Sequence, residues 1–173
     1  MTDTVSTVAR LRAATASDHD AVDAGFGRYD LRDADDYRAF LIAHAKALPA
    51  VEAWLKDIPG LAAVRSRSEA LAADLAALGE AMPTPMAFDL AQSEAAGWGA
   101  MYVMEGSRLG GTMLSRSVPE GMPSAYLAAK HLSGEWRALL ATINRQPADE
   151  AWVADAVAGA KAAFALYRRA PEA

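Results

Sequence analysis

The sequence predicts an all-helical protein, a single-domain bundle of several helices over residues 1–173. Three observations lead to this prediction. Hydrophobic residues make up 53% of the chain and charged residues 23%, which is the balance of a globular protein with one sizeable core. Alanine is abundant, whereas strand-favouring residues are sparse. Apolar positions recur at spacings of three and four, and no segment shows the alternation typical of a strand.

Two helices are expected in the N-terminal part of the chain. An apolar face recurs over about residues 4–23 and predicts the first helix, which Gly25-Phe26-Gly27 ends. The second helix is expected to start after Asp33, a residue type favoured at helix N-caps, and to extend toward Pro59-Gly60. Pro49 lies inside this segment and is expected to kink or break the helix, because proline has no backbone N–H.

The middle of the chain predicts two further helices. The third covers roughly residues 66–81 and is followed by a proline-rich loop at residues 82–86. The fourth is expected over about residues 94–117, with Ser93 as its N-cap. The last part of the chain predicts two short helices, at 124–131 and 134–144, and then a long one.

That last helix is expected to begin near Pro147 and to end at Arg169. Proline suits the first turn of a helix, because the N–H that it lacks would have no partner there. Residues 119–123 are expected to form the loop before the two short helices.

Composition and charge exclude several classes of function. The net charge is −5 and no run of Lys or Arg is longer than Arg168-Arg169, so no nucleic-acid partner is expected. The absence of cysteine excludes disulfides, zinc–thiolate sites and cysteine nucleophiles. The N-terminus lacks an apolar signal region, and no apolar run approaches the ~20 residues that cross a bilayer, so a cytoplasmic protein without a membrane partner is expected.

The segment from Gly97 to Gly111 is unusually rich in glycine. At 100° per residue, Gly99, Gly106 and Gly110 fall in one narrow sector of a helix. Each glycine costs a helix about 0.5–1 kcal/mol relative to alanine, so this density requires a reason. Two reasons are open: close packing against another helix, or a flat ligand that lies against the backbone. The adjacent pair Gly110-Gly111 also predicts a bend.

Three histidines are candidates for a functional site. His19 has Asp23 four residues later on the same helix face, where the carboxylate can accept a hydrogen bond from one ring nitrogen. Spacing alone favours a half-buried histidine paired with an acid, since one histidine makes no metal site by itself. A single histidine suffices where a macrocycle supplies the other ligands. His44 is expected to be packed and hydrogen-bonded, and His131 to be exposed.

Two of these segments together resemble a known family. Residues 11–19, LRAATASDH, resemble the LRxxTxxxH signature of heme oxygenases, whose histidine is the proximal iron ligand. Residues 99–111, GAMYVMEGSRLGG, resemble the distal helix of that family, and residues 160–167 resemble its last helix. The chain is similar to the bacterial heme oxygenases of the bacteriophytochrome-associated type.

The resemblance implies oxidative cleavage of heme to biliverdin, carbon monoxide and iron, with heme as both substrate and cofactor. The reaction uses O2 and electrons from an external donor, such as a ferredoxin or a reductase. A bilin-accepting phytochrome is the partner that the resemblance implies for the product.

The resemblance also implies roles for individual residues. His19 is the expected axial and metal ligand, with Asp23 as its partner, and Arg12 and Arg137 are expected to hold the heme propionates. The expected catalytic distal wall consists of Gly106, Ser107 and Gly110. Further heme contacts are expected from Thr15, Tyr102, Val103 and Gly111.

Two departures from the family pattern leave other functions open. Many members have an aspartate where this chain has Ser107, and Ser133 replaces a lysine near the propionates. A non-catalytic heme- or bilin-binding protein or sensor on the same fold is therefore the alternative to an active heme oxygenase. A helical interaction module, in which the glycines pack another helix, is a third hypothesis.

Overall fold

Helices account for the regular structure of residues 5–147 and 149–173, which the computed structural model describes, and no strand occurs in these ranges. The all-helical class predicted from the sequence is therefore confirmed. The helices in chain order are α1 (Thr7–Phe26), α2 (Ala34–Lys56), α3 (Ser68–Ala77), α4 (Glu94–Leu114), α5 (Ala125–Ala128), α6 (Glu135–Asn144) and α7 (Glu150–Arg169). Short 3₁₀ turns follow α4 at Ser115–Ser117 and α7 at Ala170–Glu172. Among the helices described, none is long and apolar enough to cross a bilayer.

Side-chain caps fix where the long helices begin. Asp33 accepts hydrogen bonds from the N–H groups of Asp35 and Asp36 and caps α2, and Ser93 caps α4, both as predicted. Ser6 caps α1 by accepting a hydrogen bond from the N–H of Ala9. The predicted start of α1 at residue 4 lies outside the described residues.

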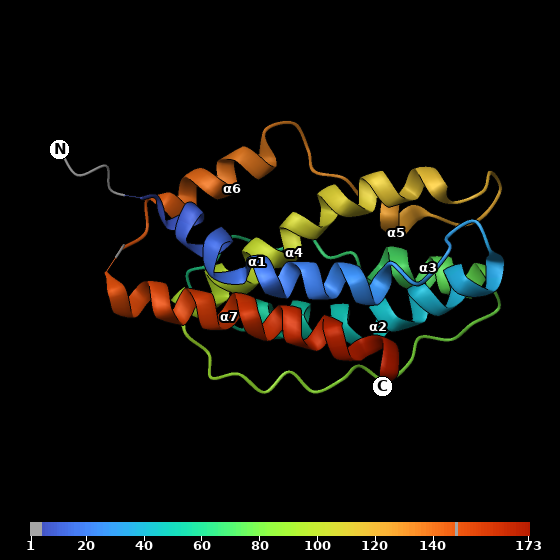
Figure 1. Cartoon of the computed structure of the whole chain (residues 1–173), viewed down its shortest axis with the longest axis horizontal. Coiled ribbons are helices and arrows are strands. Elements are labelled where there is room, and N and C mark those ends of the chain that lie inside the picture. The colour runs from blue at the N-terminus through green and yellow to red at the C-terminus, as the bar shows by residue number, and fades with distance from the viewer. Residues whose placement is uncertain (1–4, 148) are drawn as a thin grey trace.

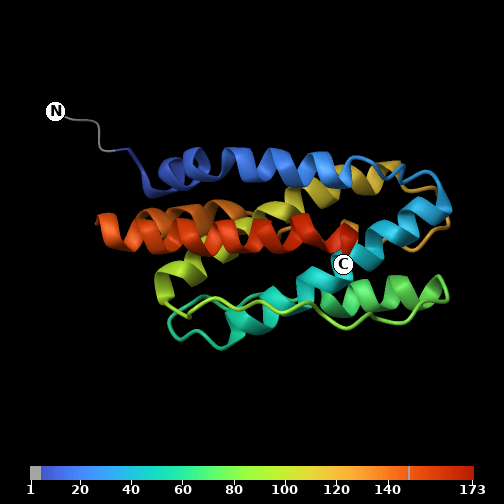
Figure 2. The same ribbon diagram turned by 60° about the horizontal axis from the view of Figure 1, so that its bottom comes forward.

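The helix α2 continues through Pro49, so the predicted break does not occur. Proline leaves carbonyl groups of the preceding turn without their usual partners. The carbonyl of Lys46, three residues earlier, accepts a hydrogen bond from the N–H of Met86 at 2.8 Å. Met86 belongs to the extended segment of residues 78–93, which runs along the bundle beside α2 and α3 (Figure 2). This segment supplies a donor to α2 where proline disturbs the helix.

Other predicted boundaries were wrong by a few residues. The helix α7 begins at Glu150 and not at Pro147, because the carboxylate of Asp149 accepts a hydrogen bond from the N–H of Trp152 at 2.8 Å and caps the helix there. The helices α3 and α5 are shorter than the predicted segments at 66–81 and 124–131. Predicted boundaries depended on residue patterns, whereas side-chain hydrogen bonds fix the observed ones.

Both α1 and α4 pack against α7, which runs beside α1 along the bundle (Figure 1). The contact between α4 and α7 is very close. A Cβ atom on Gly99 would lie 1.7 Å from the carbonyl oxygen of Ala156, and one on Gly159 would lie 1.9 Å from the carbonyl oxygen of Ala96. Only glycine fits at these two positions, so one glycine of the α4 face serves helix packing.

Candidate functional site

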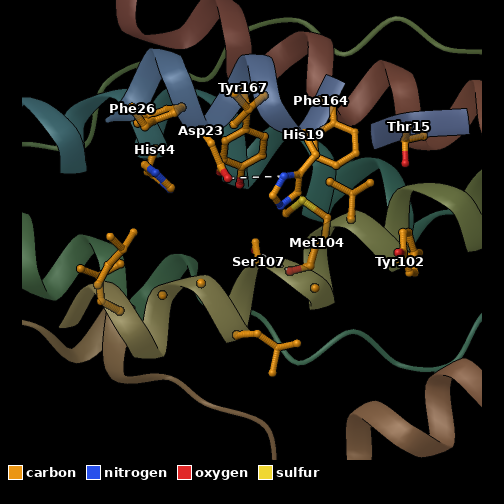
Figure 3. Close-up of a pocket in the computed structure, with 18 of the residues that line it drawn as sticks. Thr15, His19, Asp23, Phe26, His44, Tyr102, Met104, Ser107, Phe164 and Tyr167 are labelled. Carbon is orange, nitrogen blue, oxygen red and sulfur yellow. Dashed lines mark hydrogen bonds and ion pairs between the residues drawn. The ribbon is translucent and has the colours of Figure 1, made fainter. Parts of the chain in front are cut away.

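A cavity of about 520 Å³ lies between α1 and the second half of α4 (Figure 3). Its volume is within the ~300–1,000 Å³ that is usual for small-molecule and cofactor sites. Most of its lining residues belong to α1 and α4, and the others come from α2, α5, α6, α7 and the turn before α3. Apolar and aromatic side chains dominate the lining, with a few polar groups at defined places.

His19 projects from α1 into this cavity, and its side chain is 60% exposed. Its Nδ1 lies 3.4 Å from a carboxylate oxygen of Asp23 (Figure 3). A carboxylate oxygen of Asp20 is 3.8 Å from the same nitrogen. Phe164 of α7 packs edge-on against the ring, with the two centroids 6.0 Å apart. Because both carboxylates lie on the Nδ1 side, Nε2 is left to donate its electron pair to a ligand.

Across the cavity, α4 presents its backbone (Figure 3). A Cβ atom on Gly110 would meet no atom within 4 Å, and one on Gly106 would meet only the indole of Trp136, at 3.5 Å. These two glycines therefore face open space, in contrast to Gly99. The glycines of this face therefore differ: Gly99 serves helix packing, whereas Gly106 and Gly110 border the open space of the cavity.

Ser107 lies between these glycines, and its hydroxyl group makes one hydrogen bond as a donor and one as an acceptor. It donates to the carbonyl of Met104 at 2.7 Å and accepts a hydrogen bond from Nη2 of Arg67 at 2.8 Å. The same Nη2 donates to the carbonyl of Met104 at 2.8 Å. The Ser107 proton therefore points to the helix backbone, and the cationic group beside it is Arg67, a residue that the sequence did not single out.

His44, Tyr126 and Tyr167 form the polar part of the lining on the side of α2 and α5. The Nδ1 of His44 and the hydroxyl of Tyr126 are 2.6 Å apart, which confirms the prediction that His44 is packed and hydrogen-bonded. Burial and the nearby charge of Arg67 lower the pKa of His44 to about 3, so its ring is neutral near pH 7. Burial also raises the pKa of Tyr126, whose proton is therefore retained.

Nearly all of the predicted site residues come together in this cavity. Those that line it are Arg12, Thr15, His19, Asp23, Tyr102, Val103, Gly106, Ser107, Gly110 and Gly111. Arg137 does not: it is exposed on α6, next to Trp136, which does line the cavity. Arg67, His44 and Tyr126 were missed, because they come from separate segments and share no motif.

His131 is buried, with 8% of its side chain exposed, so the predicted exposure was wrong. Its Nε2 lies 3.3 Å from a carboxylate oxygen of Glu105. Its ring stacks on Trp136 at a centroid distance of 5.5 Å, and Trp136 stacks on Tyr102 at 5.8 Å. The polar sequence around His131 suggested exposure, but the ring is part of an aromatic stack that supports the wall of the cavity.

Together, the fold and this site define an all-helical protein in which His19 of α1 faces the glycines of α4 across an apolar cavity. No family model matches the chain. Heme oxygenase from Xanthomonas campestris pv. campestris is 37% identical to it over 150 residues, which cover 78% of this chain and 88% of that protein. Heme oxygenase from Neisseria meningitidis, solved with NO and CO bound, matches the structure with a TM-score of 0.80 at 28% identity. That match covers 98% of this chain and 92% of the Neisseria chain.

The chain therefore belongs to the heme oxygenase family of enzymes, as the two sequence motifs predicted.

Proposed function

We propose that this protein cleaves heme oxidatively to biliverdin, carbon monoxide and iron, with heme bound in the cavity between α1 and α4. The observation that carries the proposal is the position of His19 opposite the open backbone at Gly106 and Gly110. An imidazole with a free nitrogen fits an iron ligand, and a glycine wall fits the face of a flat macrocycle. The apolar lining fits the porphyrin itself. The residues present are thus compatible with heme as substrate.

The residues of the chain hold the substrate and shape the space around it. His19 would hold the heme iron through Nε2, and the carboxylate of Asp23, 3.4 Å from Nδ1, would orient the ring. Arg12 lines the cavity, is exposed, and has no ion-pair partner among the described residues, so its guanidinium is available for a propionate. Arg137 reaches a second propionate only if its flexible side chain turns toward the cavity. Thr15, Tyr102, Val103 and Gly111 complete the contacts.

Heme supplies the iron at which O2 is reduced and the macrocycle that is opened. The contribution of α4 is steric: Gly106 and Gly110 admit a small ligand and limit how it lies. Because the Ser107 hydroxyl donates to Met104, we assign Ser107 to holding Arg67 in place rather than to donating a proton into the cavity.

The external partners in this proposal follow from the chemistry. Heme cleavage consumes electrons, and the family resemblance implies a separate ferredoxin or reductase as their source. A cytoplasmic location and transfer of the bilin to a phytochrome complete the proposal; the phytochrome partner rests on the resemblance of the two motifs.

The test is to add heme, O2 and a ferredoxin with its reductase, and to record the absorption spectrum. Loss of the Soret band with growth of bilin absorbance and release of carbon monoxide is the expected result. Stable bound heme without bilin would instead support the alternative, a heme-binding protein or sensor, which the engaged hydroxyl of Ser107 favours. Absence of any heme-dependent spectrum would refute both.

A further inference from the structure

Arg67 is a buried arginine in the turn before α3, and it is held in place from both ends. Its side chain is 4% exposed and lines the cavity. Glu52 of α2 accepts a hydrogen bond from its backbone N–H at 2.8 Å. The other oxygen of Glu52 accepts from the hydroxyls of Ser66 and Ser68, each at 2.6 Å. The turn is therefore fixed to α2, and the guanidinium projects inward toward α4.

The guanidinium of Arg67 has no ion-pair partner in the described part of the chain, and the nearby carboxylate of Glu52 binds the backbone N–H of Arg67 instead. No ion pair within residues 5–147 and 149–173 includes it, and the groups that its side chain contacts are neutral: two oxygens of α4 and the ring of Tyr126, 5.5 Å from its Cζ. Arg108 is equally buried, but its Nε lies 2.8 Å from the carboxylate of Glu105. Of these two arginines in the interior, only Arg67 faces the cavity, and only Arg67 lacks an ion-pair partner for its guanidinium within the described ranges.

The guanidinium also has unused donors. Both of its hydrogen bonds leave from Nη2, whereas Nη1 and Nε have no hydrogen-bond partner in the part of the chain that the structure describes. A guanidinium carries five N–H groups, and three of them belong to these two nitrogens. These two nitrogens are accessible from the cavity, where a ligand can accept hydrogen bonds from them. Charge-assisted hydrogen bonds from a guanidinium to an anion are strong.

We infer that the part of the cavity beside Ser107 and Tyr126 is a binding subsite for a small monovalent anion, with Arg67 as its cationic partner. The class of ligand comprises azide, halides and one-carbon carboxylates, whose size suits a corner of a cavity that heme would otherwise fill. A neutral diatomic molecule gains nothing from the charge. The inference deepens the proposed function and rests on it in one respect: the subsite acts on ligands of the heme cavity, on the glycine-wall side.

The first experiment uses the heme-free protein, titrated calorimetrically with sodium azide and with sodium bromide at about pH 8, where imidazoles are neutral and arginine is charged. The wild-type protein is expected to bind both anions. Arg67→Met should weaken binding at least about tenfold, because it removes the charge and its donors. Arg67→Lys should retain part of the affinity. Arg116→Met is the matched control, since it removes one exposed positive charge outside the cavity and should leave binding unchanged.

The second experiment uses the heme-loaded protein and needs no turnover. Arg67→Met should weaken azide binding to the ferric form about tenfold and change carbon monoxide binding to the ferrous form by less than about threefold. If Arg67→Met does not fold, the azide and carbon monoxide affinities of Arg67→Lys are compared with those of the wild type instead.

The outcomes separate the two proposals. Failure to bind heme would refute the proposed function and leave the heme-free titration as the test of the subsite. Normal heme cleavage, with no anion binding by the heme-free wild type at about pH 8, would overturn the subsite alone. Equal affinity of wild type and Arg67→Met, or equal losses for azide and carbon monoxide, would also overturn it.

Discussion

Gly99→Ala and Gly110→Ala place the same methyl group on the same face of α4, with opposite expected effects. A Cβ atom on Gly99 would lie 1.7 Å from the oxygen and 2.6 Å from the carbon of the Ala156 carbonyl, and 3.0 Å from the nitrogen of Ala160. All three are backbone atoms, so α4 and α7 must move apart. Overpacking costs up to about 3 kcal/mol, and alanine recovers about 1 kcal/mol of helix propensity. Gly99→Ala should therefore lose about 2 kcal/mol of unfolding free energy, or about 4–8 °C in Tm.

Gly110→Ala should instead stabilise the heme-free protein by about 0.5–1 kcal/mol, because no atom lies within 4 Å of the added group. The same methyl projects into the cavity and should weaken heme binding about tenfold or more. Urea unfolding followed by circular dichroism measures the first effect, and a heme titration at the Soret band measures the second. Gly25→Ala in α1 is the control for helix propensity, since it also meets no atom within 4 Å and lies outside the cavity. Equal stability of Gly99→Ala and Gly110→Ala, or wild-type heme affinity in Gly110→Ala, would refute this reasoning.

Three further predictions concern single side chains. His19→Ala should abolish the Soret spectrum of the ligated heme, and added imidazole should restore it; a wild-type spectrum in the variant would contradict the assignment of His19 as ligand. Asp74→Ala should lower the unfolding free energy by about 1–3 kcal/mol, because the buried carboxylate accepts two backbone hydrogen bonds at the start of α5, at 3.0 and 2.8 Å. Urea unfolding measures this loss, and Asp74→Asn, which retains one oxygen acceptor, should lose less. Folding lowers the pKa of His44 from 6.5 to about 3, so the unfolded chain binds more protons between these values, and stability should fall as pH falls through this window. The contribution reaches about 1.4 kcal/mol per pH unit, and a His44→Gln variant with an unchanged slope would show that another group is responsible.

Much of the fold follows from local rules that the sequence displays. The periodic apolar faces predicted the long helices, and Asp33 and Ser93 predicted two helix starts, because a cap needs only its own side chain and the next turn. The prediction at Pro49 was less successful, since the donor beside it, Met86, lies in a segment distant in the sequence. Asp149 defines the start of α7 more strongly than Pro147, and both are common near helix starts.

The residues of the candidate site also fall into two groups, those that the sequence predicts and those that it does not. His19 and Asp23 are four residues apart on one helix, and Gly106 and Gly110 share a face, so spacing alone places each pair. Arg67 reaches the cavity from a turn that Glu52 holds, and no pattern around it predicts that contact. The burial of His131 depends on Trp136, which comes from the next helix. These contacts join segments that are distant in the sequence, so only the tertiary fold reveals them.

The glycine contact between α4 and α7 lies outside the cavity, at another part of α4. It nevertheless affects the width of the cavity. His19 stands on α1, which packs on α7, and Phe164 of α7 touches the imidazole. The glycine wall belongs to α4, whose distance from α7 is set where Gly99 and Gly159 meet the opposing backbone. The width of the gap between the histidine and the wall therefore depends on two residues that do not line the cavity. A larger residue at either position should push α4 away from α7 and widen this gap.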